Sequence, residues 1–146
     1  MNVCYRTIKL TKLFSSHAKQ KLNQNEMCNL VYKYLCPCKS FYIGETKRLL
    51  QIRAHDHQTK SRNTHIYQHI STCATYIKEA SEFALNYPNQ FTSPKKAKVV
   101  FFKSKFSVLE KGFRNEHARK KCEAYHIKLQ RPNINDQIHL KAFTLF

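Results

Sequence analysis

The chain has 146 residues and is 42% hydrophobic, which suits one ordinary domain with a modest core. Its 26 lysines and arginines against 9 acidic residues give a formal net charge of +17, and such an excess favours nucleic acid as the partner over an anionic membrane surface. No apolar run approaches the roughly 20 residues that cross a bilayer, which argues against a membrane protein.

The first residues, MNVCYRTIKLTKLF, mix cations into the apolar positions and do not resemble a secretory signal. We therefore expect an intracellular, reducing compartment, in which the six cysteines stay free or bind metal. The basic, acid-free start leaves a mitochondrial presequence as an alternative. Residues 1–27 are interpreted as a basic arm or linker, 28–137 as the domain, and 138–146 as a C-terminal tail.

The domain begins with two short predicted strands. Residues 29–36, NLVYKYLC, alternate and are rich in aromatic and aliphatic side chains, CPCKS supplies a turn, and FYIGE at 41–45 resumes the strand pattern. From Thr46 the period changes to that of an amphipathic helix in TKRLLQIRAHDHQTK, with Thr46 as its N-cap. A second helix is predicted over 61–72.

The second half of the domain is less regular. Residues 74–97 contain Asn and Pro and no sustained pattern, so a helix over 76–85 followed by a loop is predicted. VVFFKSKF at 99–106 predicts a third strand, and 114–130 predicts a long helix that PNIN terminates. The expected fold is a small α/β domain of the α+β kind: a three-stranded, mainly antiparallel sheet flanked by helices.

Four chemically useful residues accompany one glycine in the hairpin and first helix. Tyr32 and Tyr42 lie ten residues apart on the two arms of the hairpin, so both phenols project from one sheet face if the register holds. Gly44 permits a close backbone approach or an unusual dihedral. Arg53 and His57 are spaced i and i+4, which places them on one helical face.

These residues resemble the GIY-YIG nuclease superfamily. The triplets LVY at 30–32 and YIG at 42–44, the run YIGETKRLLQIRAHDH, the segment CEAYHI at 122–127 and PNIN at 132–135 occur in the order of that family's motifs. Leucine and valine replace the glycine and isoleucine of the first triplet. The resemblance implies the GIY-YIG fold and a metal-dependent DNA endonuclease or nickase; the alternative is a catalytically inactive nucleic-acid-binding domain of the same fold.

The resemblance also implies a role for each site residue. Glu123 holds Mg²⁺ or Mn²⁺, and Arg53 binds the scissile phosphate and stabilises its charge. Tyr32 orients or deprotonates the attacking water, supported by Tyr42, and this requires positive charge to lower the pKa of the phenol. His57 shares the proton transfer because imidazole titrates close to neutrality. Gly44 and Asn135 are expected to be structural residues near the site.

Within the superfamily the chain looks most similar to the endonuclease domain of Penelope-like retroelements. That likeness implies a nuclear protein, a reverse transcriptase domain in the parent polyprotein, and paired Cys and His ligands for a structural zinc ion. The candidate ligands are Cys36, Cys38, His69 and Cys73. The Cys-x-Cys spacing is tighter than usual for zinc, so ordinary reduced cysteines remain the alternative.

Basic residues in the second half of the domain are expected to contact the phosphates of DNA and to make binding steeply salt dependent. They do not specify a sequence, because phosphate contacts position a protein without reading bases. The residues expected in this role are Lys95, Lys96, Lys98, Lys103, Lys105, Arg114, Arg119, Lys120 and Lys121.

Overall fold

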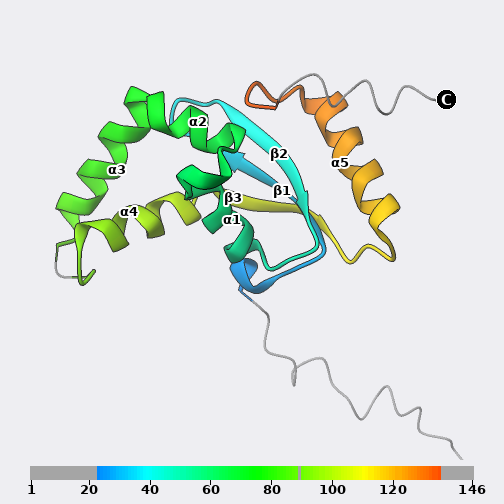
Figure 1. Cartoon of the computed structure of the whole chain (residues 1–146), viewed down its shortest axis with the longest axis horizontal. Coiled ribbons are helices and arrows are strands. Elements are labelled where there is room, and N and C mark those ends of the chain that lie inside the picture. The colour runs from blue at the N-terminus through cyan, green and yellow to red at the C-terminus, as the bar shows by residue number, and fades with distance from the viewer. Residues whose placement is uncertain (1–22, 89, 136–146) are drawn as a thin grey trace, which may run out of the picture.

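The computed structural model describes residues 23–88 and 90–135, so most of the expected arm at 1–27 and the tail at 138–146 lie outside the described residues. The described part is a mixed α+β structure with one three-stranded sheet (Figure 1). Its strands are β1 (Leu30–Leu35), β2 (Phe41–Thr46) and β3 (Phe106–Lys111). Its helices are α1 (Leu50–Gln58), α2 (His65–Thr72), α3 (Ala74–Asn86), α4 (Pro94–Lys103) and α5 (Glu116–Gln130), with short 3₁₀ turns η3 (Gln24–Glu26) and η4 (Lys60–Arg62).

The sheet has the order β2-β1-β3 and both pairings are antiparallel, as predicted. Strands β1 and β2 form the expected hairpin, in which Tyr32 faces Gly44 and Tyr34 faces Tyr42. The turn is closed by a hydrogen bond from the Cys36 amide to the Ser40 carbonyl (2.8 Å). This register puts Tyr32 and Tyr42 on the same face, since they are diagonal neighbours on adjacent strands.

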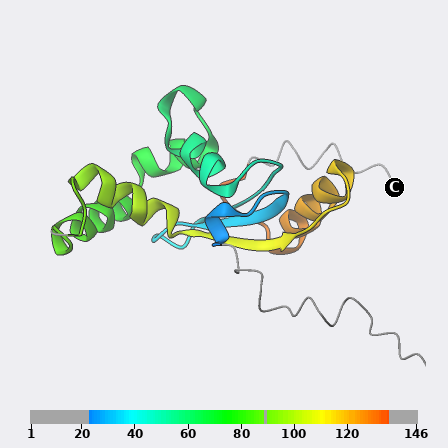
Figure 2. The same cartoon turned by 90° about the horizontal axis from the view of Figure 1, so that it is seen from below.

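The two faces of the sheet are covered by different helices. On one face Tyr32 contacts His57 of α1 and Tyr34 packs against Phe102 of α4, and α1 and α2 lie above this face in Figure 2. The alternate residues of the hairpin point the other way, where Lys33 bonds to Gln130 of α5. The tyrosines therefore lie in the main core, whereas α5 packs on the opposite face.

Helix α1 begins later than predicted. Thr46 is the last residue of β2 and not an N-cap; its hydroxyl accepts a hydrogen bond from the Arg48 amide (3.1 Å) within a turn, and the helix starts at Leu50. Sequence alone could not place this boundary, because a threonine hydroxyl stabilises turns and helix starts by the same kind of bond.

The segment at 74–103 is the main correction to the predicted fold. The predicted helix over 76–85 is confirmed as α3, but the loop predicted after it includes the start of α4, and the strand predicted at 99–106 is largely helical. Ser93 caps α4 by accepting a bond from the Lys96 amide (3.3 Å), and Pro94 occupies the first turn, where its missing N–H costs nothing. VVFF is helical here because one face packs against α3, and tertiary contacts override β propensity. Helices α3 and α4 lie side by side, at the end of the molecule away from α5 (Figures 1 and 2).

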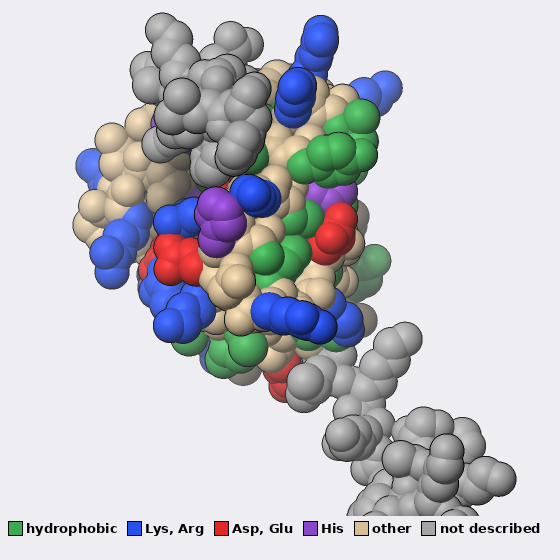
Figure 3. All heavy atoms as spheres, turned by 90° about the vertical axis from the view of Figure 1, so that its right-hand side faces the viewer, with side chains coloured by type: hydrophobic (Ala, Val, Ile, Leu, Met, Phe, Trp, Pro, Cys, Tyr) green, Lys and Arg blue, Asp and Glu red, His purple; other side chains and the backbone are tan. Residues whose placement is uncertain are grey.

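Helix α5 is close to the predicted one and ends the described fold. It is capped by Asn115, whose side chain accepts from the Ala118 amide (2.8 Å), and it ends at Arg131 in the left-handed conformation (φ 50°). None of the described helices is both long and apolar enough to cross a bilayer. Viewed from the side that carries α5, lysine and arginine side chains are spread over the surface and not gathered in one patch (Figure 3).

Candidate functional site

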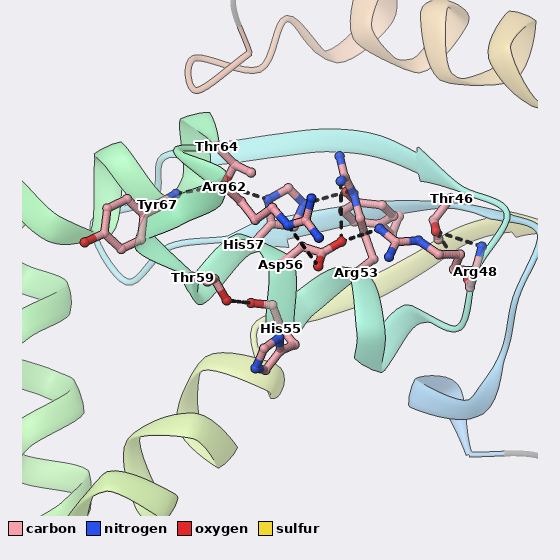
Figure 4. A network of polar contacts seen from close by, with 11 residues as sticks. Thr46, Arg48, Arg53, His55, Asp56, His57, Thr59, Arg62, Thr64 and Tyr67 are labelled. Carbon is pink, nitrogen blue, oxygen red and sulfur yellow. Dashed lines mark hydrogen bonds and ion pairs between the residues drawn. The ribbon is translucent and has the colours of Figure 1, made fainter.

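A buried tyrosine hydroxyl joins the hairpin to α1. Tyr32 is fully buried, and its oxygen lies 2.7 Å from Nε2 of His57 and accepts a hydrogen bond from Nε of Arg53 (3.2 Å). The i, i+4 spacing on α1 therefore brings the guanidinium and the imidazole to one phenol, as the sequence predicted for their shared face. Figure 4 shows this arrangement within a larger set of polar contacts.

Sequence reasoning missed Thr64, which contacts the imidazole of His57. Thr64, the N-cap of α2, lies with its hydroxyl 3.0 Å from Nδ1 of His57. Its position before a helix is a typical capping signal, but nothing in the sequence indicated the histidine as a partner. We call Tyr32, Arg53, His57 and Thr64 the tyrosine network.

Asp56 is the second residue that sequence reasoning missed. Its carboxylate is buried, forms an ion pair with Arg48, and lies within 4.0 Å of Arg53 and 3.9 Å of Arg62 (Figure 4). An acidic residue amid the cations of RAHDH was the available signal, since the chain has only 9 acids. Arg53 thus contacts two partners, the Tyr32 hydroxyl through Nε and the Asp56 carboxylate near Nη1.

The protonation states of the network follow from its burial. Burial, with Arg53 adding to it, lowers the pKa of His57 to about 3, so the imidazole is neutral at neutral pH. Burial and the neighbouring Tyr42 raise the pKa of Tyr32, and the opposing effect of Arg53 is smaller. The phenol therefore donates to Nε2, and Nδ1–H donates to Thr64.

Two expectations about proton transfer are therefore wrong. Positive charge was expected to lower the pKa of Tyr32, but the loss of hydration of a buried phenolate outweighs the attraction of one guanidinium. His57 was expected to titrate near neutrality, but burial beside Arg53 disfavours its charged form. Tyr32 is a hydrogen-bond donor in this structure and not a phenolate base.

Gly44 gives the tyrosines the space they occupy. A Cβ atom at this position would lie 2.6 Å from Cε1 of Tyr42 and 2.7 Å from the hydroxyl of Tyr32. The expected close approach is confirmed, and the unusual dihedral is not, since Gly112 is the positive-φ glycine among the described residues. The rings of Tyr32 and Tyr42 are 6.3 Å apart, and Tyr42 is only half-buried.

Glu123 of α5 interacts electrostatically with the same tyrosines and with Arg53. Burial and the charge of Glu45 raise its pKa to about 7, while Arg53 pulls it down. Burial is the main cause of the raised pKa of Tyr42, and the charge of Glu123 adds to it. Glu123 also contributes, as a smaller cause, to the raised pKa of Tyr32, so the carboxyl group and the two phenols share one electrostatic environment. Residues from β1, β2, α1 and α5 that are distant in sequence thus converge.

Arg119 of α5 is not available to bind DNA, contrary to expectation. Its side chain is only 6% exposed, forms an ion pair with Glu45, and donates from Nη1 to the amide oxygen of Asn29 (2.7 Å). A periodic basic helix does not reveal which cation turns inward, so the sequence could not separate Arg119 from its neighbours. This arginine fixes α5, and hence Glu123, against the edge strand.

Asn135 ties the end of the fold to the YIG strand. Its side-chain oxygen accepts from the Ile43 amide (2.9 Å) and its side-chain nitrogen donates to the Ile43 carbonyl (2.7 Å). Two residues back along each segment, the Asn133 side chain accepts from the Phe41 amide (2.8 Å) and donates to the Ser40 hydroxyl (3.0 Å). Asn135 was expected to be a structural residue near the site, and both asparagines hydrogen-bond to the backbone along the outer edge of β2.

The predicted zinc ligands form a second cluster on the same face of the sheet. The ligand atoms of Cys36, Cys38, His69 and Cys73 all lie within 4.8 Å of one another. We call this set the thiol cluster. The sulfur atoms of Cys36 and Cys73 are 3.9 Å apart, and Cys38 Sγ lies 3.4 Å from Nε2 of His69.

These separations fit a tetrahedral metal ion. Zinc bonds of about 2.3 Å to sulfur and about 2.0 Å to nitrogen, at tetrahedral angles, place two sulfurs about 3.8 Å apart and sulfur and nitrogen about 3.5 Å apart. The Cys-x-Cys spacing is accommodated because the hairpin turn bends sharply at Lys39, which has a φ of 70°. The thiol cluster can therefore hold a metal ion.

A second group of metal-capable side chains has a different explanation. Glu110, Cys122 and His126 also lie together, on the α5 side of the sheet. Lys33 donates to Oε1 of Gln130, which leaves the Gln130 amide nitrogen facing Nδ1 of His126 (3.2 Å). The proton of His126 is then on Nε2 and is donated to Glu110 (2.9 Å), so this nitrogen serves a hydrogen bond and not a metal.

Comparison with protein-family models, with curated proteins and with solved structures finds no match to this chain.

Proposed function

We propose that this chain is a metal-dependent DNA endonuclease or nickase of the GIY-YIG type. The observation that carries the proposal is the convergence on Tyr32: Arg53 and His57 both hydrogen-bond to its hydroxyl, and the charge of Glu123 acts on the same phenol. Two phenols, a guanidinium and a carboxyl group form the set that phosphodiester hydrolysis requires, namely a phosphate-binding cation, a metal ligand and groups that orient water.

Exposure divides these residues into two roles. Tyr42 and Glu123 are half-buried and the Arg53 side chain is 30% exposed, so these three can touch a substrate. Tyr32 and His57 are 0% and 1% exposed and are saturated by their mutual contacts, so they act as positioning residues. The proposed catalytic residues are thus Tyr42, Arg53 and Glu123, held in place by the tyrosine network.

The charge distribution suits a divalent cation at Glu123. Its carboxyl group is half-buried, its pKa is raised to about 7, and the second carboxylate, Glu45, is the main charge responsible. A cation beside them would relieve that repulsion, and Mg²⁺ or Mn²⁺ accepts one or two carboxylates together with waters. When bound, the ion would supply a coordinated water of lowered pKa. Arg53 would pair with phosphate oxygens, and the Tyr42 hydroxyl would orient the water by hydrogen bonding.

We further propose that the thiol cluster binds a structural zinc ion. Three thiolates and one imidazole are the donor set that zinc prefers, and a closed four-ligand site is structural and not catalytic. The ligands join the hairpin turn to α2, so the ion would crosslink the sheet to the helix whose N-cap contacts His57. The likeness to retroelement endonucleases supports the same assignment.

DNA would also contact the basic start of α4, at the end of the molecule away from α5 (Figure 1). Lys95, Lys96 and Lys98 are exposed, and their helix contains no acidic residue. Replacing all three with glutamine should reduce the slope of log affinity against log salt concentration by about three, if each lysine neutralises one phosphate. Mutation of Glu79 and Glu82 to glutamine on the adjacent α3 is the matched control and should not flatten that slope.

The test is a supercoiled-plasmid nicking assay with Mg²⁺ and with EDTA. Glu123→Gln and Arg53→Lys should each lower nicking by about 10² to 10³, because each removes a preorganised contact to the developing charge. Glu116→Gln, on an exposed turn of the same helix, should nick like the parent. Equal nicking by the parent and by Glu123→Gln would contradict the proposed site.

A non-catalytic nucleic-acid-binding domain is the second candidate. The full burial of Tyr32 and His57 favours it, because neither group reaches a substrate in this structure. Salt-dependent DNA binding by a parent protein that never nicks, with any of Mg²⁺, Mn²⁺ or Zn²⁺ added, would establish this candidate over the nuclease.

A further inference from the structure

One buried hydroxyl next to the thiol cluster has no hydrogen-bond partner. Tyr34 lies on the central strand with its side chain fully buried, and its hydroxyl is the unpartnered buried side-chain group among the described residues. Its ring packs between Phe102 and Phe106, with ring centres 5.3 Å and 5.1 Å away. The ring therefore cannot turn the hydroxyl out to water, and an unsatisfied buried O–H needs an explanation.

A ligand atom of the thiol cluster is a candidate acceptor for this hydroxyl. Tyr34 and Cys36 belong to the same cluster of buried core residues, and after burial Cys36 is the largest cause of the raised pKa of Tyr34. Tyr34 and Cys36 are two residues apart along the hairpin and point to the same face of the sheet. The hydroxyl thus faces the metal ligand nearest to it in the chain.

The acceptor strength of Cys36 depends on whether a metal is bound. Cys36 is buried, and a thiol sulfur without a metal is only a weak hydrogen-bond acceptor. Coordination removes the thiol proton, and the resulting thiolate is a charged acceptor for which an O–H donor is well suited.

We propose that Tyr34 is a positioning residue of the metal site and donates a hydrogen bond to the Cys36 thiolate when the thiol cluster holds zinc. This inference rests on the proposed zinc site. Outer partners of this kind orient the ligand, and their loss weakens metal binding by about 10- to 100-fold. The metal-free protein, by contrast, has an orphan hydroxyl that a phenylalanine at position 34 would remove.

Tyr34→Phe should therefore change the two forms of the full-length protein in opposite directions. It should weaken zinc binding, measured by chelator competition, by about 10- to 100-fold. It should leave the melting temperature of the reduced, metal-free protein equal to or above that of the parent, because an unsatisfied polar group has been removed. A residue that only packs would shift both quantities the same way.

Cobalt substitution supplies a readout of the hydrogen bond itself. In the cobalt-loaded protein, loss of a donor to the thiolate should move the sulfur-to-cobalt charge-transfer band to longer wavelength in Tyr34→Phe. Tyr76→Phe is the matched control: this residue is also buried and Cys36 also raises its pKa, after burial, but its hydroxyl is not a fully buried group without a partner, so the band should stay in place.

The outcomes separate this inference from the zinc proposal. A parent protein that binds neither zinc nor cobalt overturns both. A parent that binds metal, with Tyr34→Phe matching it in affinity and absorption, overturns the role of Tyr34 and leaves the zinc site standing. Equal destabilisation of the metal-free and metal-bound forms by Tyr34→Phe identifies a packing role and also overturns the inference.

Discussion

The tyrosine network and the thiol cluster lie on one face of the same sheet, yet they differ in what they need to be complete. In the network, each donor meets an acceptor: Arg53 donates to Tyr32, Tyr32 to His57, and His57 to Thr64. In the thiol cluster, thiols face one another and an imidazole, and a nearby tyrosine hydroxyl has no partner. The first is complete without a ligand, whereas the second brings together four atoms that can hold a metal ion.

One small domain can thus carry two different arrangements on one sheet face. The tyrosine network is already hydrogen-bonded, whereas the thiol cluster brings together atoms that can hold a metal ion. The two are connected through β1, which carries Tyr32 and leads directly into Cys36, and through α2, which has Thr64 as its N-cap and Cys73 as its C-cap. A substitution in one cluster should therefore affect the other, and the size of that effect measures how strongly the two clusters are coupled.

Removing the metal should have the largest effect. With zinc at about 1,000 times its dissociation constant, binding contributes about 4 kcal/mol of stability, which a chelator or Cys73→Ser should abolish. Calorimetric melting of the reduced protein with and without zinc measures this. Cys28→Ser is the matched control, since Cys28 is exposed and outside the cluster. Should zinc leave the melting temperature of the parent unchanged, the thiol cluster would not be a metal site.

Gly44→Ala should come next, and should damage the network and not the cluster. The new Cβ would lie under 3.0 Å from both tyrosine side chains, and overpacking of this kind costs about 1 to 3 kcal/mol. Nicking should fall with stability, because the phenols and Arg53 are displaced together. Gly112→Ala is the control: it also meets backbone strain, at a φ of 80°, but contacts nothing within 4 Å, so it should lower stability without a specific loss of nicking.

The pH dependence of stability should report the buried His57. Its pKa of about 3 in the folded protein lies below the unfolded value near 6.5, so the unfolded state binds the extra proton first as pH falls. Stability should drop by up to about 1.4 kcal/mol per pH unit from pH 6.5 towards 3, and His57→Gln should remove this drop.

Glu123 opposes this slope and must be neutralised to expose it. Its pKa of about 7 in the metal-free fold exceeds the ordinary 4.5, so its contribution is full below pH 4.5 and is lost as pH rises through 7. The free energy of unfolding in urea should therefore be compared, as a function of pH, between the single variant Glu123→Gln and the double variant that also carries His57→Gln. The control is a double variant that carries Glu123→Gln and His55→Gln. Because His55 is exposed, this variant should keep the fall in stability between pH 6.5 and 3. Parallel curves in the first pair would show that His57 is not buried as a neutral group.

Thr64→Ala should have the smallest effect but act on both clusters. It removes the α2 cap and the partner of His57, with an expected cost of about 1 kcal/mol. Because α2 carries His69 and Cys73, zinc affinity should fall slightly as well. Ser93→Ala removes the cap of α4 instead and should change stability alone. If Thr64→Ala left zinc affinity unaltered while destabilising the apo fold, the clusters would be independent.

Several features could be predicted from sequence because they depend on neighbours along the chain. The hairpin, the shared face of Tyr32 and Tyr42, the convergence of Arg53 and His57, and the grouping of the four zinc ligands all follow from periodicity and residue type. The third strand and the helix at Pro94–Lys103 were misplaced, because VVFF is compatible with either state until α3 supplies a packing surface.

What the sequence alone determined about this protein is thus local: which residues form the hairpin and α1, and which side chains share a face. Only the tertiary structure decided that Tyr32 and His57 are buried, that Asp56 and Arg119 are structural partners, and that the pKa values of the network move away from neutrality. The physical reason is that burial and electrostatic environment are sums over segments far apart in the chain, which no short stretch of sequence contains.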